Sequence, residues 1–325
     1  MYQTVSDHLK KIDTVLLASH THPDGDAIGS LTALGAALLN MGKNVTLYNE
    51  HPVPAAYRFL PLSDCLVHAI PDPGKYEAAV ILDCSKIERL GHLARTIGAV
   101  PLLINIDHHC SNDHFGGIQL VDCEACATAE IVYNLLKTMQ ADITREVAYG
   151  IYTGILTDTA SFSFSNTQAS AFAICGEMVN AGVDPQAVSK NVYITYSHER
   201  IRLMQMVLDT FALSPDGAVS VMLVTQEMIK KSGMKTENVG RVVNYAKHIE
   251  NVRISALALE EENHNEDLPA GVSNFHVSLR SDGSVDVAKI AVGFGGGGHN
   301  KAAGFNITTT LSGVKETILG LANGL

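Results

Sequence analysis

The chain has 325 residues, of which 46% are apolar and 18% are charged, and its formal net charge is −11. This composition predicts a globular protein with room for two domains rather than a disordered chain. The acidic balance argues against a basic face for long duplex nucleic acid, because such a face needs many phosphate contacts. Six cysteines without the framework of a small secreted protein, an N-terminus without an apolar signal core and the lack of a bilayer-spanning apolar run predict a cytoplasmic protein without a membrane partner.

The first half of the chain alternates short apolar runs with helical patterns. Buried parallel strands are predicted at residues 14–20, 44–50, 77–85 and 101–109. Apolar residues at helical spacing predict helices at residues 27–42, 128–139 and 145–156. This alternation predicts an α/β fold with a doubly wound, mostly parallel sheet.

A smaller second α/β domain is predicted after a helical linker. One long helical segment, 187–213, is followed by an "SPDG" turn. Beyond the turn we expect strands at 218–226, 252–261, 275–281 and 285–291, a helix at 238–249 and a solvated loop at 260–271. The predicted boundaries place the first domain at 1–190, the helical linker at 191–215 and the second domain at 216–325.

Ionisable side chains gather where the predicted strands of the first half end. Four of them crowd into seven residues after the first strand: His20, His22, Asp24 and Asp26. Later strands end at Asp83 and at the run Asp107, His108 and His109, and Asp158 ends a helix or begins the following turn. Ligand sites of open α/β sheets gather at the carboxyl ends of strands, so we expect the groups that end strands to meet there.

The chemistry that suits such a cluster is two-metal hydrolysis. Four carboxylates, those of Asp24, Asp26, Asp83 and Asp158, would balance two divalent cations with a water or hydroxide between them. Mixed oxygen and imidazole ligands favour Mn²⁺, or Mg²⁺ at weaker affinity. Taken singly, each Asp could be a helix cap and "HPDGD" a turn. Together, unpaired carboxylates would repel one another without cations.

A glycine run marks the second domain. In "GFGGGGHNKAAGF", the four glycines Gly295, Gly296, Gly297 and Gly298 could leave backbone N–H groups free to hold a phosphate. His299 and Lys301 would add donors, and Arg280 on a neighbouring strand could bind a phosphate with two hydrogen bonds. The alternatives are a flexible turn for the glycines and a solvated sheet edge for the arginine.

In this order, the motifs resemble those of the DHH phosphoesterase family. "SHTHPDGDAIGS", "ILDCS", "NIDHHCSN" and "TGILTDTASF" are similar to its four motifs. "GFGGGGHNKAAGF", preceded by "VSLRS", resembles the signature of the associated DHHA1 domain. The resemblance extends from Ser19 to Phe305 and so covers nearly the whole chain.

The resemblance implies a role for each motif residue. One metal ion would be held by His20, Asp24 and Asp83. The other would be held by Asp26, Asp83, His108 and Asp158, with Asp83 bridging. His109 is implied to contact the substrate phosphate, and Asp107 to orient the neighbouring histidine. His22 is not counted as a ligand, and the glycine run with His299 is implied to hold the nucleotide.

Length and domain content are most similar to the bifunctional oligoribonucleases (nanoRNases) and pAp phosphatases. This similarity implies hydrolysis of short single-stranded oligonucleotides and dinucleotides to mononucleotides, and removal of the 3′-phosphate of pAp. It implies no long duplex nucleic acid and no membrane as partners, and it is compatible with a homodimer. One alternative is a soluble phosphodiesterase for linear or cyclic dinucleotides such as pApA or c-di-AMP. Another is a non-catalytic nucleotide-binding regulator, which predicts a missing metal ligand, whereas every expected ligand is present.

Overall fold

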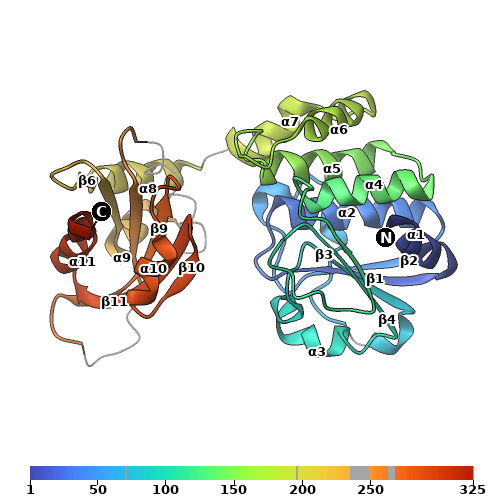
Figure 1. Ribbon diagram of the computed structural model, residues 1–325, viewed down its shortest axis with the longest axis horizontal. Helices are drawn as coiled ribbons and strands as arrows, with labels where there is room; N and C mark the ends of the chain where they lie inside the picture. Colours follow the sequence, from blue (N-terminus) through green and yellow to red (C-terminus); the bar gives the residue numbers. More distant parts are fainter. Residues whose placement is uncertain (71, 195–196, 235–248, 263–267, 325) are drawn as a thin grey trace. The chain divides into compact units, whose positions relative to one another are not determined.

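The computed structural model describes residues 1–70, 72–194, 197–234, 249–262 and 268–324 (Figure 1). The chain divides into two compact units, Met1–Thr195 and Tyr196–Leu325. Within the described ranges, no helix is both long enough and apolar enough to cross a membrane. All but the last residue of the helix expected at 238–249, and the middle of the loop expected at 260–271, lie outside these ranges.

The N-terminal unit contains a five-stranded parallel sheet in the order β2-β1-β3-β4-β5. Its strands are β1 (Thr14–Ser19), β2 (Asn44–Tyr48), β3 (Ala78–Leu82), β4 (Leu102–Asp107) and β5 (Ile118–Val121). The four predicted strands and the doubly wound parallel sheet are therefore confirmed. The short edge strand β5 was not predicted, because only one of its four residues is fully buried and it gives little apolar signal.

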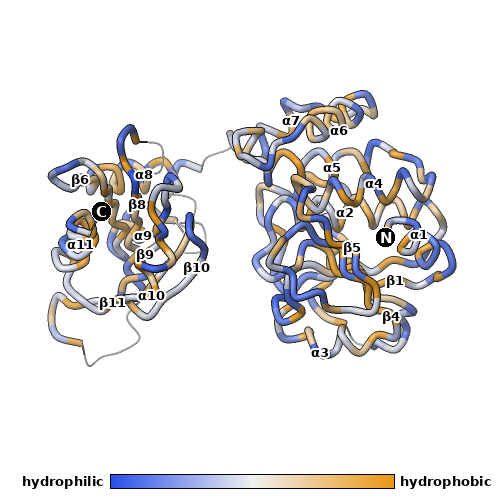
Figure 2. The backbone as a smooth tube through the Cα atoms, viewed as in Figure 1, coloured by the Kyte–Doolittle hydropathy of each residue, from blue (hydrophilic) through white to orange (hydrophobic). Residues whose placement is uncertain are grey.

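Two layers cover the sheet. The longer helices are α1 (Tyr2–Lys11), α2 (Gly25–Asn40), α4 (Thr128–Met139), α5 (Arg145–Asp158) and α6 (Ala169–Asn180). Shorter helices are α3 (Ala94–Ile97), α7 (Pro185–Ser189), η1 (Ala55–Tyr57), η2 (Ser63–Cys65), η3 (Pro73–Lys75) and η4 (Ile87–Leu93). Along β1, Val15 and Leu17 pack into one core cluster, whereas Leu16 and Ala18 pack into a second on the opposite face. All five residues from Val15 to Ser19 are buried, as expected for a strand covered on both faces. Figure 2 colours much of the strand region of this unit as hydrophobic.

Glycines bring α2 and α5 together. A Cβ added at Gly150 would lie 2.5 Å from the carbonyl oxygen of Gly29, and one at Gly25 would lie 2.4 Å from Oγ1 of Thr157. The start of α2 therefore lies against the end of α5. This close approach is possible only because these positions lack side chains.

The segment between the units is helical, as predicted, but it is not one helix. The chain passes from α7 through a π-helical turn, η5 (Lys190–Ile194), and starts again in α8 (His198–Leu208). The Ser197 hydroxyl caps α8 by accepting the amide of Arg200, which fixes a new helix start. The last residues of the predicted helix instead form β6 (Ala212–Leu213), which pairs with β7 (Val219–Val224).

The C-terminal unit contains a mixed six-stranded sheet in the order β10-β11-β9-β8-β7-β6. Its other strands are β8 (Ile254–Glu260), β9 (Val272–Ser281), β10 (Gly297–His299) and β11 (Ala302–Thr310). Only β7 and β8 pair in parallel; the remaining pairs are antiparallel. Among the described residues of this unit, the helices besides α8 are α9 (Gln226–Ser232), α10 (Val287–Gly293), α11 (Leu311–Leu319) and η7 (Gly320–Gly324).

The strand predicted at 285–291 is wrong, because this segment forms α10. The carboxylate of Asp286 caps the helix by accepting the amides of Ala288 and Lys289. Val287 and Ala291, four residues apart, are both buried on its inner face. The alternation of apolar and polar residues at the start of the segment hid this helical spacing.

Candidate metal centre and active site

His20 and Asp83 lie at the point where the strand order reverses. In a sheet of order 2-1-3-4-5, crossovers run in opposite directions from β1 and β3, which leaves a crevice at their carboxyl ends. His20 directly follows β1, and Asp83 directly follows β3. Nε2 of His20 lies 3.5 Å from Oδ2 of Asp83 and 4.0 Å from Oδ1 of Asp24. These three side chains form one group that could hold a metal ion.

Asp83 is held in an unusual backbone conformation. Its φ of 55° lies in the left-handed region, which is rare for residues other than glycine. Its amide donates to the carbonyl of Ile106, and the Thr128 hydroxyl donates to its Oδ1 at 3.1 Å. Strain of this kind persists only where the surroundings fix it, and it is common at functional sites.

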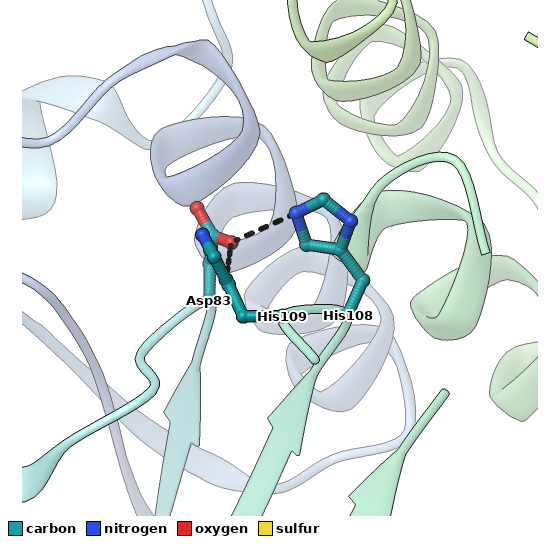
Figure 3. A group of neighbouring side chains, drawn as sticks. All are labelled: Asp83, His108 and His109. Atoms are coloured by element: carbon teal, nitrogen blue, oxygen red, sulfur yellow. Dashed lines mark ion pairs between the residues drawn. The ribbon is translucent and has the colours of Figure 1, made fainter. Parts of the chain in front are cut away.

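Asp83, His108 and His109 form a second group that could hold a metal ion (Figure 3). Nε2 of His108 is 3.8 Å from Oδ1 of Asp83 and 3.7 Å from Oδ2 of Asp158. Asp158 is the last residue of α5, and the Asn166 side chain donates to its Oδ2 at 3.2 Å. The two oxygens of Asp83 therefore face different histidines, His20 and His108.

His109 contacts both Asp83 and Asp107, and its closer partner is Asp107. Its Nδ1 lies 2.7 Å from Oδ1 of Asp107 but 3.6 Å from Oδ1 of Asp83. Asp107 is fully buried and also accepts the His108 amide and the Asn112 side chain. The hydrogen bond with Asp107 raises the pKa of His109 to about 9, so its imidazole is cationic at neutral pH. A cationic imidazole suits a phosphate oxygen better than a metal ion.

Asp26, in the first turn of α2, is buried against the start of α4. Its carboxylate accepts the amides of Thr128 at 2.6 Å and Ala129 at 2.9 Å, and the hydroxyl of Ser30 at 3.2 Å. Gly154 makes room for it, since a Cβ there would lie 2.7 Å from its Oδ1. Among the described residues, Asp26 belongs to neither group of side chains that could hold an ion. Its role as a ligand stays a prediction.

Asp24 and His22 lie on the connection from β1 to α2. Oδ1 of Asp24 accepts the amides of Asp26 and Ala27, so this residue is the N-cap of α2 as well as a candidate ligand. His22 is exposed and has a φ of 54°. Its ring stacks on that of His51 at a centroid distance of 4.0 Å.

The electrostatics of the cluster favour bound cations. Burial, and then the charges of Asp83 and Asp158, raise the pKa of Asp26 well above its usual range. Burial also raises the pKa of Asp158 to about 6. For Asp83 burial acts in the same direction, but the hydrogen bond and charge of His20, helped by His108 and His109, bring its pKa down to about 2. The carboxylates thus repel one another, and hard divalent ions with oxygen and imidazole ligands fit this donor set.

Several residues that hold the site were missed by sequence reasoning. They include Ser30, Asn49, His51, Asn112, Thr128, Gly154 and Asn166. Asn112 lies inside the "NIDHHCSN" motif and could have been singled out there. Ser30 and Gly154 also lie inside quoted motifs, "SHTHPDGDAIGS" and "TGILTDTASF". Asn49, His51 and Thr128 carry no local signal, because their partners are distant in the sequence.

In the C-terminal unit, the glycine run forms part of a hairpin. Gly297, Gly298 and His299 make up β10 and pair with Gly304, Ala303 and Ala302 of β11. Gly298 has a φ of 144°, and a Cβ there would lie 2.5 Å from Cα of Ala303. The glycines therefore allow two backbones to approach closely, and Gly297 and Gly298 lie in a paired strand rather than in a flexible turn. Phosphate binding by the glycine run stays a prediction.

Arg280 and His299 share one row of this sheet. His299 pairs with Ala302, and Ala302 pairs with Arg280 on β9. Residues directly opposite one another in antiparallel strands point to the same face, so only the methyl group of Ala302 separates the two side chains. Arg280 is half-buried, with Nη1 donating to its neighbour Leu279, whereas His299 is exposed.

Each of the two units matches the model of a known protein family. The model of the DHH family, N-terminal domain, matches residues 14–155, and that of the DHHA1 domain matches residues 217–323. The bifunctional oligoribonuclease and PAP phosphatase NrnA of Thermus thermophilus is 32% identical over 304 residues, covering 92% of this chain and 86% of that protein. The protein of the same description from Bacillus subtilis is 27% identical, covering 91% of this chain and 90% of that protein.

A solved structure matches over the full length. The crystal structure of an exopolyphosphatase-related protein from Bacteroides fragilis superimposes with a TM-score of 0.87 at 28% identity. The match covers 98% of this chain and 96% of that one. The chain belongs to the DHH family, with a DHH domain followed by a DHHA1 domain, and is a hydrolase that acts on phosphoester bonds.

Proposed function

We propose that this chain is a metal-dependent phosphoesterase that degrades short oligonucleotides, including dinucleotides, to mononucleotides and removes the 3′-phosphate of pAp. The observation that carries the proposal is the position of Asp83, whose two carboxylate oxygens face His20 and His108. A carboxylate placed between two sets of ligands is what a two-metal hydrolytic site requires. Relatives named oligoribonuclease and PAP phosphatase cover more than nine-tenths of the chain, which supports the substrate class.

Two divalent cations would complete the site. One would be held by His20, Asp24 and Asp83. The other would be held by Asp26, Asp83, His108 and Asp158. Hard oxygen ligands mixed with imidazole favour Mn²⁺, with Mg²⁺ as the weaker alternative. When bound, such ions offset phosphate charge and lower the pKa of a coordinated water.

The chain itself supplies the charge that meets the phosphate. His109, cationic because of its hydrogen bond with Asp107, would donate from Nε2 to a phosphoryl oxygen. Asp107 would keep the ring oriented and its charge in place, while Asn112 holds the second oxygen of Asp107 at 2.6 Å. Because Asp107 is fully buried, this orientation is fixed before substrate arrives.

The DHHA1 domain would hold the nucleotide. His299, Arg280 and the glycines at 295–298 would bind the phosphate or sugar of the end that is not cleaved. A chain with a net charge of −11 offers little counter-charge to a longer polyanion, which supports short substrates over long ones. The cytoplasmic location and the homodimer stay predictions.

A substrate panel tests the proposal. Initial rates would be measured with a dinucleotide, a long single strand, pAp, linear pApA and c-di-AMP, each with Mn²⁺ and with Mg²⁺. Asp83→Asn, which keeps the shape of the side chain but removes its charge, is the matched control. We expect the dinucleotide and pAp to be hydrolysed fastest by the wild-type chain and not by the variant.

Two other results would redirect the assignment. Faster hydrolysis of c-di-AMP than of the linear dinucleotide would favour a cyclic dinucleotide phosphodiesterase. A preference for the long strand would favour an exonuclease of long substrates.

A further inference from the structure

Three successive backbone groups of the ligand loop are bound by residues outside the proposed metal-ligand set. The carbonyl of His20 accepts the Asn49 side chain at 2.8 Å. The amide of Thr21 donates to the carbonyl of Arg89 at 2.7 Å, and the amide of His22 donates to Nδ1 of His51 at 3.0 Å. The loop between the candidate ligands His20 and Asp24 is thus fixed from two sides.

The first support comes from the segment that follows β2. Asn49 is fully buried, and its side-chain nitrogen also donates to the Ser19 hydroxyl at 2.8 Å. The carbonyl oxygen of the same side chain accepts the amide of His51 at 3.0 Å. Asn49 therefore positions His51, and His51 in turn contacts the loop.

The geometry of His51 defines what it contributes. Because Nδ1 accepts the His22 amide, the ring proton of a neutral His51 lies on Nε2. The His22 ring stacks on the His51 ring with an interplanar angle of 21°. His22 also has a φ of 54°, a conformation that the chain adopts only when neighbouring contacts stabilise it.

The second support comes from η4 and is joined to the first. Oε2 of Glu50 accepts the His92 amide at 2.5 Å and lies 2.6 Å from Nδ1 of the same histidine. Gly91, with a φ of 83°, permits this contact, since a Cβ there would lie 1.7 Å from Oε2 of Glu50. Arg89, which accepts the Thr21 amide, is in the same short helix. The β2 end and η4 therefore brace the loop as one unit.

We propose that His51 is a positioning residue for metal binding: its Nδ1 holds the loop so that His20 and Asp24 converge on Asp83 before an ion arrives. The inference rests on the proposed metal dependence. A ligand set that is already ordered loses less conformational entropy on binding. Among the described residues, His51 belongs to neither candidate ion-binding group, so it acts through the loop rather than on the ion.

Binding of Mn²⁺ alone tests this role. The full-length chain would be stripped with chelator and titrated with Mn²⁺ by calorimetry. His51→Asn keeps an acceptor close to the position of Nδ1, whereas His51→Phe keeps a flat ring on His22 but has no acceptor. His8→Leu is the control, because it removes a half-buried imidazole on α1 whose Nδ1 also contacts a backbone carbonyl.

We expect His51→Phe to weaken Mn²⁺ at one of the two sites by about 10-fold, the lower end of the range for residues that orient ligands. His51→Asn and His8→Leu should bind within a factor of about two of wild type, well below the tenfold that corresponds to 1.4 kcal/mol. Wild-type affinity in His51→Phe would overturn the inference. So would a loss in His51→Asn equal to that in His51→Phe, because the acceptor would then be irrelevant.

Thermal unfolding of each variant separates loop positioning from general damage. If His51→Phe does not fold, His51→Ala takes its place. Weaker Mn²⁺ binding in His51→Ala together with wild-type affinity in His51→Asn supports the acceptor role, and equal affinities in the two overturn it. Failure of the proposed function can be distinguished from failure of the inference about His51. A wild-type chain that binds two Mn²⁺ ions but hydrolyses no nucleotide would refute the function and leave the role of His51 intact.

Discussion

The two units carry their candidate functional groups in opposite settings. In the N-terminal unit, His20, Asp26 and Asp83 are each less than 5% exposed and each is held by hydrogen bonds or ion pairs. In the C-terminal unit, His299 and most of the glycine run are exposed on a hairpin. Ion binding demands fixed donors and compensated charge, whereas a nucleotide can be held by exposed side chains and backbone.

The glycines of the two units show the same contrast between a buried and an exposed setting. Gly154 in α5 is surrounded, and a Cβ there would lie 2.5 Å from Cβ of Ala129. Gly297 in β10 has no atom within 4 Å of the position that a Cβ would take. One glycine is required by packing against Asp26 in the candidate site, and the other leaves open space beside a strand.

The largest effect is expected from Asp83, because it is the group that both ions would share. Asp83→Ala should lower kcat at least about 1000-fold, which is about 4 kcal/mol of barrier. The fold should survive, since the apolar strands that support it are unchanged. Steady-state kinetics measures the loss of activity, and circular dichroism shows whether the fold survives. Activity within about 10-fold of wild type, only about 1.4 kcal/mol, would contradict the shared-ligand role.

The second-largest effects are expected from the adjacent histidines His108 and His109, whose variants should differ in metal content. His109→Ala should lower turnover about 100-fold, within the range for removing one group that stabilises transition-state charge, and retain both ions. His108→Ala should lose one ion, because its Nε2 faces Asp83 and Asp158. Metal content of the two purified variants decides the matter. Loss of an ion in His109→Ala would show that the division of the pair is wrong.

The glycine contrast predicts a difference in stability. Gly154→Ala should destabilise the chain by about 1–3 kcal/mol, the usual effect of overpacking a close contact. Gly297→Ala should change the free energy of unfolding by less than about 1 kcal/mol, because its backbone does not need glycine. Urea unfolding of both variants gives the comparison. Equal stability in the two would mean that α4 and α5 adjust to the added methyl group.

The smallest effect is expected from the exposed hairpin. His299→Ala should lower kcat/KM for a dinucleotide about 10-fold, which is about 1.4 kcal/mol. A nitrophenyl phosphodiester, which offers no second nucleotide to hold, should be affected much less. Metal binding should not change. Equal losses with both substrates would place His299 outside nucleotide recognition.

The sequence predicted strands that are long apolar runs better than helices whose starts depend on a single capping residue. The β-α alternation of the first half gave the parallel sheet, because strands buried on both faces are continuous apolar runs. The segment 285–291 was misread as a strand, since only the Asp286 cap and the spacing of Val287 and Ala291 mark it as α10. The break before α8 was missed because one serine, Ser197, caps a helix within an otherwise helical pattern.

What the sequence determined by itself was the set of groups available for chemistry: acidic and imidazole side chains at the ends of apolar runs, and a glycine run further on. Only the tertiary structure decided which groups meet and how they are held. His20 and Asp83 are 63 positions apart in number, and the Asp26 carboxylate is bound by amides of Thr128 and Ala129 more than 100 positions away. Such contacts depend on strand order and helix packing, which no local pattern encodes. The same reason hid His51, whose function comes from one hydrogen bond to a loop that precedes it by 29 positions.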